Sequence, residues 1–153
     1  MPHYKRPESV LVLIHTPRLD ILLLERADFP GYWQSVTGSL EPDETPPHAA
    51  QRELFEESGL DATRDGQLRD AHHQTTYPIY EQWRHRYPPG TTHNTEHLFT
   101  FLVPAPRAVT LSPREHRQSL WLPWQEAAEK VFSPSNREAI LALDSRMTRL
   151  IQL

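Results

Sequence analysis

Three glutamates in the sequence have the spacing of a cation-binding site. Glu53, Glu56 and Glu57 stand at positions i, i+3 and i+4, so a helix would place them within an arc of roughly 100°. Like charges on one helical turn repel each other unless water or a cation screens them. Hard divalent cations such as Mg²⁺ or Mn²⁺ prefer carboxylate oxygens and often bind beside substrate phosphates. A structural interpretation is also open: an exposed polar face on which Arg52 pairs with Glu56.

A longer pattern encloses these glutamates. Gly38 is followed after five residues by Glu44, and after seven more by the run RELFEESGL, residues 52–60. Seven fixed residue types and two aliphatic positions would coincide by chance roughly once in 10⁷ chains of this length. The pattern therefore favours the cation site over the exposed polar face.

The helix that carries the glutamates has a signal at each end. Thr45 suits the N-cap, Pro46 follows at the first helical position, and Gly59 suits the C-terminal cap. These residues predict a helix from about 46 to 58.

Strands and further helices are expected around this helix. The apolar runs 9–15 and 20–25 flank a turn-like segment and predict a β-hairpin. Strands are expected at 33–37, 72–80, 96–103 and 119–122, with a helix from 123 to 131. A capping box at 135–138 predicts a final helix toward residue 149. This mixture indicates a single α/β layered domain over residues 1–153.

Composition limits the partners of the chain. Sixteen Lys and Arg against twenty Asp and Glu among 153 residues give a net charge of −4, so no polycationic surface for nucleic acid or an anionic membrane is expected. The longest aliphatic runs, 10–14 and 21–24, are far shorter than a membrane span. We expect a soluble, cytoplasmic monomer that acts on a small molecule.

Catalysis in this chain must come from carboxylates, histidines, hydroxyls or a metal, because the sequence has no cysteine. Zinc is not expected, although the nine histidines include an i, i+4 pair at His93 and His97. Their segment is predicted to be extended, which separates such positions by about 13 Å.

The segment GSLEPDETPPHAAQRELFEESGL, residues 38–60, resembles the Nudix box, GX5EX7REUXEEXGU, at every fixed position. The resemblance implies a Nudix hydrolase, which uses divalent metal to cleave a phosphoanhydride bond. It also implies the α/β/α sandwich of that family, with a mixed sheet and the box as a loop-helix-loop.

The resemblance also assigns roles to residues. It implies that Arg52 and Glu44 form an orienting pair, and that Glu57 or a further carboxylate acts as the base. That further carboxylate is Glu115, just before the last predicted strand, with Glu96 as the alternative. The metal ligands implied are Glu53, Glu56, Glu57, Glu115 and the carbonyl of Gly38.

Segments outside the box extend the resemblance. YKRP at 4–7, WQSVTG at 33–38, RHRYPPGTTHNTE at 84–96 and SNRE at 135–138 resemble the bacterial dihydroneopterin triphosphate pyrophosphohydrolases of folate synthesis. This similarity implies hydrolysis of 7,8-dihydroneopterin 3′-triphosphate to the monophosphate and pyrophosphate. Two alternatives stay open: a Nudix enzyme acting on nucleoside triphosphates, and a binding module without turnover, which would be expected to lack box carboxylates.

Several residues outside the box are candidates for binding the substrate. Lys5 and Arg26 are expected to hold phosphates, because ammonium and guanidinium groups match phosphate oxygens. Thr37 is expected to offer its hydroxyl, and the similarity adds Ser133. A pterin ring is expected to stack on Tyr77, Pro78, Ile79 and Tyr80.

Overall fold

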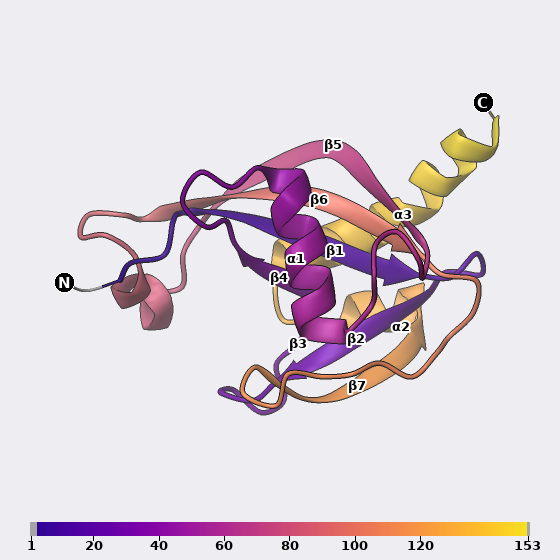
Figure 1. Ribbon diagram of the computed structural model, residues 1–153, viewed down its shortest axis with the longest axis horizontal. Coiled ribbons are helices and arrows are strands. Elements are labelled where there is room, and N and C mark those ends of the chain that lie inside the picture. Colours follow the sequence, from indigo (N-terminus) through magenta and orange to yellow (C-terminus); the bar gives the residue numbers. More distant parts are fainter. Residues whose placement is uncertain (1–2, 153) are drawn as a thin grey trace.

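The computed structural model describes residues 3–152, with side chains as far as residue 144. The described strands are β1 (Glu8–His15), β2 (Asp20–Arg26), β3 (Trp33–Gln34), β4 (Val36–Ser39), β5 (Gln67–Pro78), β6 (His93–Leu102) and β7 (His116–Pro123). The helices are α1 (Pro46–Ser58), α2 (Trp124–Lys130), α3 (Pro134–Gln152) and the 3₁₀ helix η1 (Glu81–Arg86). All seven of these strands belong to one sheet, in the order β3-β2-β1-β6-β5, with β4 beside β1 and β7 beside β2 (Figure 1).

Strand β1 lies at the centre of the sheet. It runs parallel to β6 from Glu8 to His15 and antiparallel to β4 on its other side. It pairs with β2 only where His15 faces Ile21. The predicted hairpin is therefore confirmed, but its antiparallel pairing is confined to the end next to the turn, because β4 takes the same side of β1 from Ser9 to Val12.

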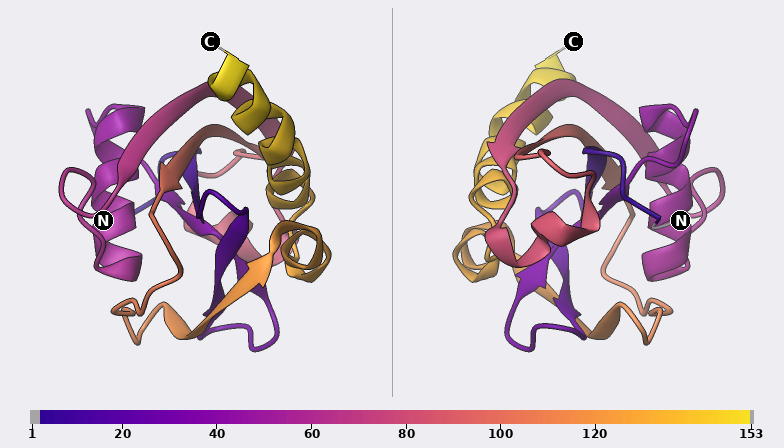
Figure 2. Two further views of the ribbon diagram at one scale, coloured as in Figure 1. Left: turned by 90° about the vertical axis from the view of Figure 1, so that its right-hand side faces the viewer. Right: turned by 90° about the vertical axis from the view of Figure 1, so that its left-hand side faces the viewer.

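The sheet is covered on both faces, as Figure 2 shows: α1 lies on one side, and α2 with α3 lies on the other. Alternate residues of β1 serve the two sides. Val10, Val12 and Ile14 join the cluster that includes Leu54 of α1, and Leu11 and Leu13 join the opposite cluster. Because helices cover both faces of the sheet, β1 and β2 consist of continuous apolar residues rather than alternating apolar and polar ones.

Helix α1 has the bounds and the caps that the sequence predicts. The Thr45 side chain accepts a hydrogen bond from the backbone N–H of His48 at 3.4 Å. Gly59 adopts the left-handed conformation with φ of 75°, and its N–H donates to the carbonyl of Phe55. The face turned to the sheet buries Ala49, Ala50 and Leu54 together with Glu53 and Glu57.

The strand expected at 33–37 is in fact two strands separated at Ser35. The side chain of Asn136 accepts a hydrogen bond from the N–H of Ser35 at 2.9 Å and donates to its Oγ at 3.0 Å. A buried amide from another element thus takes the place of a ladder partner at Ser35. Periodicity in the sequence does not predict such a contact.

Asn136 also explains why the capping box expected at 135–138 is wrong. Helix α3 begins at Pro134, and the Oγ of Ser133 accepts from the N–H of Asn136 at 3.4 Å. The cap is therefore two residues earlier than predicted. Pro134 at the first helical position fits this start.

The strand expected at 72–80 starts earlier and ends sooner. β5 begins at Gln67 and has an irregularity before Gln74, where His72 has a φ of 52°. It ends at Pro78, and the 3₁₀ helix η1 follows, which the sequence analysis did not predict. The remaining expected strands and the helix at 123–131 correspond to β6, β7 and α2 with shifted ends. None of the helices in residues 3–152 is long and apolar enough to span a membrane.

Candidate active site

A cavity of about 1010 Å³ brings together segments that are far apart in the sequence. Its walls come from the residues before β1, the β3–β4 region, helix α1, η1 and the segment before β7. Glu44 and Pro78 are the predicted site residues that do not line it. Those that do are Lys5, Arg26, Thr37, Gly38, Arg52, Glu53, Glu56, Glu57, Tyr77, Ile79, Tyr80, Glu96, Glu115 and Ser133.

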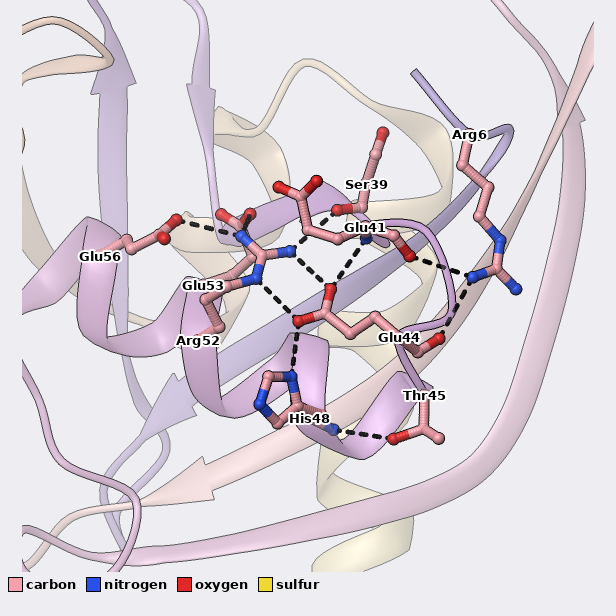
Figure 3. A network of polar contacts seen from close by, with 9 residues as sticks. All are labelled: Arg6, Ser39, Glu41, Glu44, Thr45, His48, Arg52, Glu53 and Glu56. Carbon is pink, nitrogen blue, oxygen red and sulfur yellow. Dashed lines mark hydrogen bonds and ion pairs between the residues drawn. The ribbon is translucent and has the colours of Figure 1, made fainter. Parts of the chain in front are cut away.

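Arg52 and Glu44 form the pair expected of them (Figure 3). The Nε and Nη2 atoms of Arg52 each donate to one oxygen of Glu44 at 2.8 Å. Arg52 also donates to Glu53 at 2.6 Å and to Glu56 at 3.1 Å, so the Arg52–Glu56 pair of the structural interpretation is present too. The hydrogen bonds from Arg52 lower the pKa of Glu44 to about 2. Glu44 is therefore a carboxylate at any physiological pH.

The loop before α1 is held to this pair. The N–H of Glu41 donates to Oε1 of Glu44 at 2.9 Å. Arg6 donates to the carbonyls of Glu41 and Glu44, each at 3.2 Å (Figure 3). Arg52 closes the network by donating to the carbonyl of Ser39 at 3.0 Å. The loop, the helix and the N-terminal segment are thus joined at one arginine–glutamate pair.

The three glutamates of the helix differ in exposure. Glu57 is 2% exposed and Glu53 is 7% exposed, whereas Glu56 is exposed. Burial raises the pKa of Glu57 well above its usual value, and a hydrogen bond to Glu53 and repulsion by Glu53 and Glu115 raise it further. Glu57 therefore lies in a negative environment that lacks a compensating cation.

Gly38 lets the carboxyl group of Glu53 lie directly against the backbone of β4. A Cβ at this position would overlap the Glu53 carboxyl carbon. The close approach places the backbone of β4 beside the glutamates of α1. The expected role of the Gly38 carbonyl as a metal ligand stays a prediction.

The two outer carboxylates have different surroundings. Partial burial raises the pKa of Glu115, and the charges of Glu53 and Glu56 raise it further. Burial likewise raises the pKa of Glu96, but its Oε2 accepts from the hydroxyl of Tyr77 at 3.3 Å. Glu115 thus faces the glutamate cluster, whereas Glu96 is engaged with Tyr77.

The donor set suits a hard divalent cation, because it consists of carboxylate oxygens whose mutual repulsion such an ion would offset. No three His, Asp or Glu side chains of the described residues converge as ready-made ligands. Arg52 holds Glu53 and Glu56 through hydrogen bonds. Each of these two carboxylates uses one oxygen toward Arg52, which leaves its other oxygen for a cation.

Three cationic side chains lie opposite the glutamates. Burial lowers the pKa of Lys5, and the charges of Arg86 and Arg26 lower it further. Asp28 accepts from Arg26 at 2.7 and 2.8 Å and from Arg86 at 3.4 Å. The sequence analysis expected Lys5 and Arg26 here and missed Arg86, whose place depends on η1.

Aromatic rings line another part of the cavity. Tyr80, Trp83 and Phe132 contact each other with ring centroids 5.4 to 6.1 Å apart, and the guanidinium of Arg26 lies 4.6 Å from the centroid of Trp83. Sequence reasoning named Tyr80 but missed Trp83 and Phe132. The aromatic residue inside the segment QWRHR was the available signal for Trp83.

Other predicted binding residues already have protein partners. The hydroxyl of Thr37 donates to the carbonyl of Val10 at 2.8 Å, and Tyr77 bonds Glu96 and accepts from Asn94 at 3.1 Å. Ser133 caps α3 as described above. Their part in substrate binding stays a prediction.

His116, which the sequence analysis did not single out, is buried beside the glutamates. Burial, with the nearby charge of Arg26, lowers the pKa of His116 to about 4. It follows Glu115 directly at the start of β7.

The fold and the carboxylate cavity define a class of protein. Residues 5–143 match the family model described as NUDIX domain. The chain therefore belongs to the NUDIX domain family, whose members generally use divalent metal ions. This confirms the predicted family and its α/β fold.

Individual proteins of the family are similar to this chain over most of its length. The chain is 42% identical over 139 residues to the dihydroneopterin triphosphate diphosphatase of Escherichia coli (strain K12), covering 90% of this chain and 91% of that protein. It is 40% identical over 142 residues to the enzyme of the same name from Haemophilus influenzae, covering 92% and 89%. The solved structure of the E. coli dihydroneopterin triphosphate pyrophosphohydrolase matches with a TM-score of 0.85 over 90% of this chain and 94% of that one.

Proposed function

We propose that this protein hydrolyses 7,8-dihydroneopterin triphosphate to the monophosphate and pyrophosphate, with Mg²⁺ or Mn²⁺ as the cation. The observation that carries the proposal is that one cavity holds a glutamate cluster, three cationic side chains and an aromatic cluster. These groups match the metal, the phosphates and the ring of such a substrate. The similarity to the two diphosphatases supports the choice of substrate.

Glu53, Glu56, Glu57 and Glu115, with the carbonyl of Gly38, are the groups that would hold the cation. When bound, a divalent cation neutralises phosphate charge and makes a bound water more acidic. Glu57 or Glu115 accepts the proton of the attacking water at a carboxylate oxygen. Arg52 and Glu44 hold the helix and the preceding loop in register while the carboxylates turn toward the ion.

Lys5, Arg26 and Arg86 bind the phosphate chain. Asp28 is the carboxylate that Arg26 and Arg86 share, so the three cations keep an excess positive charge for an anion. Guanidinium groups bind phosphate oxygens through paired hydrogen bonds. The cations thereby orient the chain toward the glutamates on the opposite wall.

The ring of the substrate stacks at Tyr80, Trp83 and Phe132, with Ile79 beside them. The buried Nε1 of Trp83 and Oδ1 of Asn94 have no hydrogen-bond partner within the described part of the chain, and both residues line the cavity. An unpaired donor and an unpaired acceptor suit the polar edge of a heterocycle. These groups support a ring position nearer η1 than the sequence analysis expected from Tyr77.

Product analysis over a panel of pterin and nucleoside triphosphates tests the proposal. We expect dihydroneopterin triphosphate to give the highest kcat/KM, with pyrophosphate released without equal orthophosphate. Chelation should abolish turnover, and Mg²⁺ or Mn²⁺ should restore it. A kcat/KM well above this value for a deoxynucleoside triphosphate would replace the proposal with a nucleotide hydrolase.

A further inference from the structure

His116 is a buried histidine with one satisfied and one unsatisfied ring nitrogen. It is 3% exposed, and its Nε2 lies 2.9 Å from the side-chain nitrogen of Gln34. Its Nδ1 has no hydrogen-bond partner in the described part of the protein. A buried polar atom without a partner is uncommon and points to a function or a bound group.

The neighbours of His116 determine where its proton lies. Arginine has only donors, and Nη1 of Arg26 lies 3.2 Å from Oε1 of Gln34. The amide oxygen of Gln34 therefore faces Arg26, and its NH₂ group faces His116. The Nε2 atom of His116 must then accept, which leaves the hydrogen of the neutral ring on Nδ1.

The carboxylate of Glu57 lies near this Nδ1–H. The distance from Nδ1 to Oε1 of Glu57 is 3.9 Å, and both side chains are 3% exposed. That is too long for a hydrogen bond, whose usual length is about 2.9 Å. The same oxygen also lies 3.4 Å from the N–H of Thr37. A small rotation of the Glu57 carboxylate would pair the free donor of His116.

We propose that His116 is a positioning residue for Glu57, donating from Nδ1 to Oε1 so that Oε2 is presented to the cation. The inference rests on the metal-dependent hydrolysis proposed above. It gives Gln34 a defined task, because the amide of Gln34 selects the only tautomer of His116 that can donate to Glu57. It also connects Arg26, among the phosphate-binding cations, to a carboxylate on the opposite wall through two buried side chains.

Two substitutions separate this role from simple packing. In His116→Asn the amide nitrogen can occupy the position of Nδ1, so the donor to Glu57 is kept. In His116→Gln the longer side chain places its amide near Nε2, so the contact with Gln34 is kept and the donor to Glu57 is lost. The exposed His73→Gln is the control.

The measurements are the Kd for Mn²⁺ of the substrate-free protein, from the electron paramagnetic resonance signal of free Mn²⁺, and kcat and KM separately. We expect His116→Gln to weaken Mn²⁺ binding or lower kcat about 10–100-fold, the usual effect of losing a group that orients a ligand, with little change in KM. His116→Asn should stay within about threefold of the wild type, as should His73→Gln. Equal losses in the Asn and Gln variants, or no loss in the Gln variant, would overturn the proposal.

The wild-type protein provides a second test of the proposed role of His116, which can be used even if the variants do not fold. The ¹⁵N resonances of His116 should show a protonated Nδ1 and a bare Nε2, and Mg²⁺ should shift the Nδ1–H signal. A proton on Nε2 would contradict the proposal. Neither Mn²⁺ binding nor the tautomer depends on the substrate, so failure to hydrolyse the pterin triphosphate would reject the proposed function alone.

Discussion

Burial separates carboxylates that look alike in the sequence. Glu41 and Glu57 both belong to the box region, but Glu41 is exposed and touches the network through its backbone. Glu57 is enclosed beside Glu53, Glu115 and His116. Substitution of Glu57 should therefore reduce activity far more than substitution of Glu41.

Glu57→Gln keeps the size of the side chain and removes its charge. We expect kcat to fall by about 10²–10⁴-fold, the usual cost of losing acid–base catalysis, and further if cation binding weakens. Glu41→Gln is the matched control and should keep kcat near the wild-type value. Steady-state kinetics at saturating Mg²⁺ measure both, and similar behaviour of the two variants would contradict the assignment of the box.

Glu115 and Glu96 can be compared in the same way. Because Glu115 faces Glu53 and Glu56, whereas Glu96 is bonded to Tyr77, we expect Glu115→Gln to lower kcat about 10²-fold or more. Glu96→Gln should cost much less. A titration with Mg²⁺ for each variant then shows whether Glu115 acts through the cation, and a larger loss in Glu96→Gln would exchange the two roles.

The aromatic cluster should determine which ring is preferred. Trp83→Ala or Tyr80→Ala should cost about 1–3 kcal/mol in kcat/KM, by analogy with the stacking of bases on aromatic side chains. The loss should be larger for the pterin triphosphate than for nucleoside triphosphates. Phe55→Ala removes an exposed ring outside the cavity and serves as the control. Equal losses in kcat/KM for all substrates would show that the pterin ring does not stack on this cluster.

Sequence reasoning found the box residues but missed His116, Trp83, Phe132 and Arg86. The box has a fixed spacing within 23 residues, so its geometry follows from one helix and its caps. The missed residues are isolated in the sequence, and the fold brings them to one cavity from η1, from β7 and from the segment between α2 and α3. No short sequence pattern predicts which distant residues will come together in the folded protein.

At the scale of elements, the ends of α1 were predictable because Thr45, Pro46 and Gly59 act through the backbone next to them. The division at Ser35 was not, because it depends on Asn136, about one hundred residues away in the chain. The pairing of β1 with β6 was missed for a similar reason. Its partner β6 lies beyond α1 and β5 in the sequence. The cap at Ser133 is local, and Ser133 followed by Pro134 was a signal for it that the sequence analysis overlooked.

The C-terminal cap of α1 can be tested by a pair of glycine substitutions. Gly59 and Gly90 have φ values of 75° and 87°, but only at Gly59 would a Cβ meet another residue, the side chain of Thr110 at 3.0 Å. Gly90→Ala should cost about 1–2 kcal/mol for the left-handed conformation alone. Gly59→Ala should lower the free energy of unfolding by more, as measured by urea denaturation. An equal loss would show that Thr110 moves aside freely.

At the scale of the whole molecule, two buried histidines make stability depend on pH. Burial lowers the pKa of His15 and, with Arg26, that of His116, to about 4 for the latter. The unfolded chain binds protons near pH 6.5, whereas the native state binds them only at lower pH. The contribution of these two histidines to the free energy of unfolding should therefore fall as pH decreases from about 6.5 toward 4. The raised pKa values of Glu57, Glu96 and Glu115 act in the opposite direction, so the histidine contribution is measured by comparing variants.

His15→Asn removes one of these groups and keeps a side-chain donor near the carbonyl of Thr16, which lies 3.0 Å from Nδ1 of His15. We expect a shallower decrease in the free energy of unfolding between pH 7 and 5 than in the wild type. Urea denaturation at several pH values measures it. His93→Asn, at an exposed position, is the control and should keep the wild-type slope. An unchanged slope in His15→Asn would contradict the prediction, because it would mean that folding does not change the pKa of His15.

The single domain expected over residues 1–153 stays a prediction, and residues 1, 2 and 153 lie outside the described part of the chain. The expected monomer and cytoplasmic location also stay predictions. The layered arrangement itself, with two apolar clusters on opposite faces of one sheet, is confirmed.

The parallel pairing of β1 with β6 affects how this protein is made. Ser9 faces Glu96 across that ladder, so β1 must wait until residues 93–102 have been made before the edge that faces β6 is bonded. Contacts between such distant positions slow folding, because a long loop must close before they form. A nascent chain that ends after residue 60 would contain the entire box and still lack the wall that carries Glu115 and His116. Synthesis therefore completes the glutamate site only after residues 115 and 116 have emerged, more than fifty residues after the end of the box.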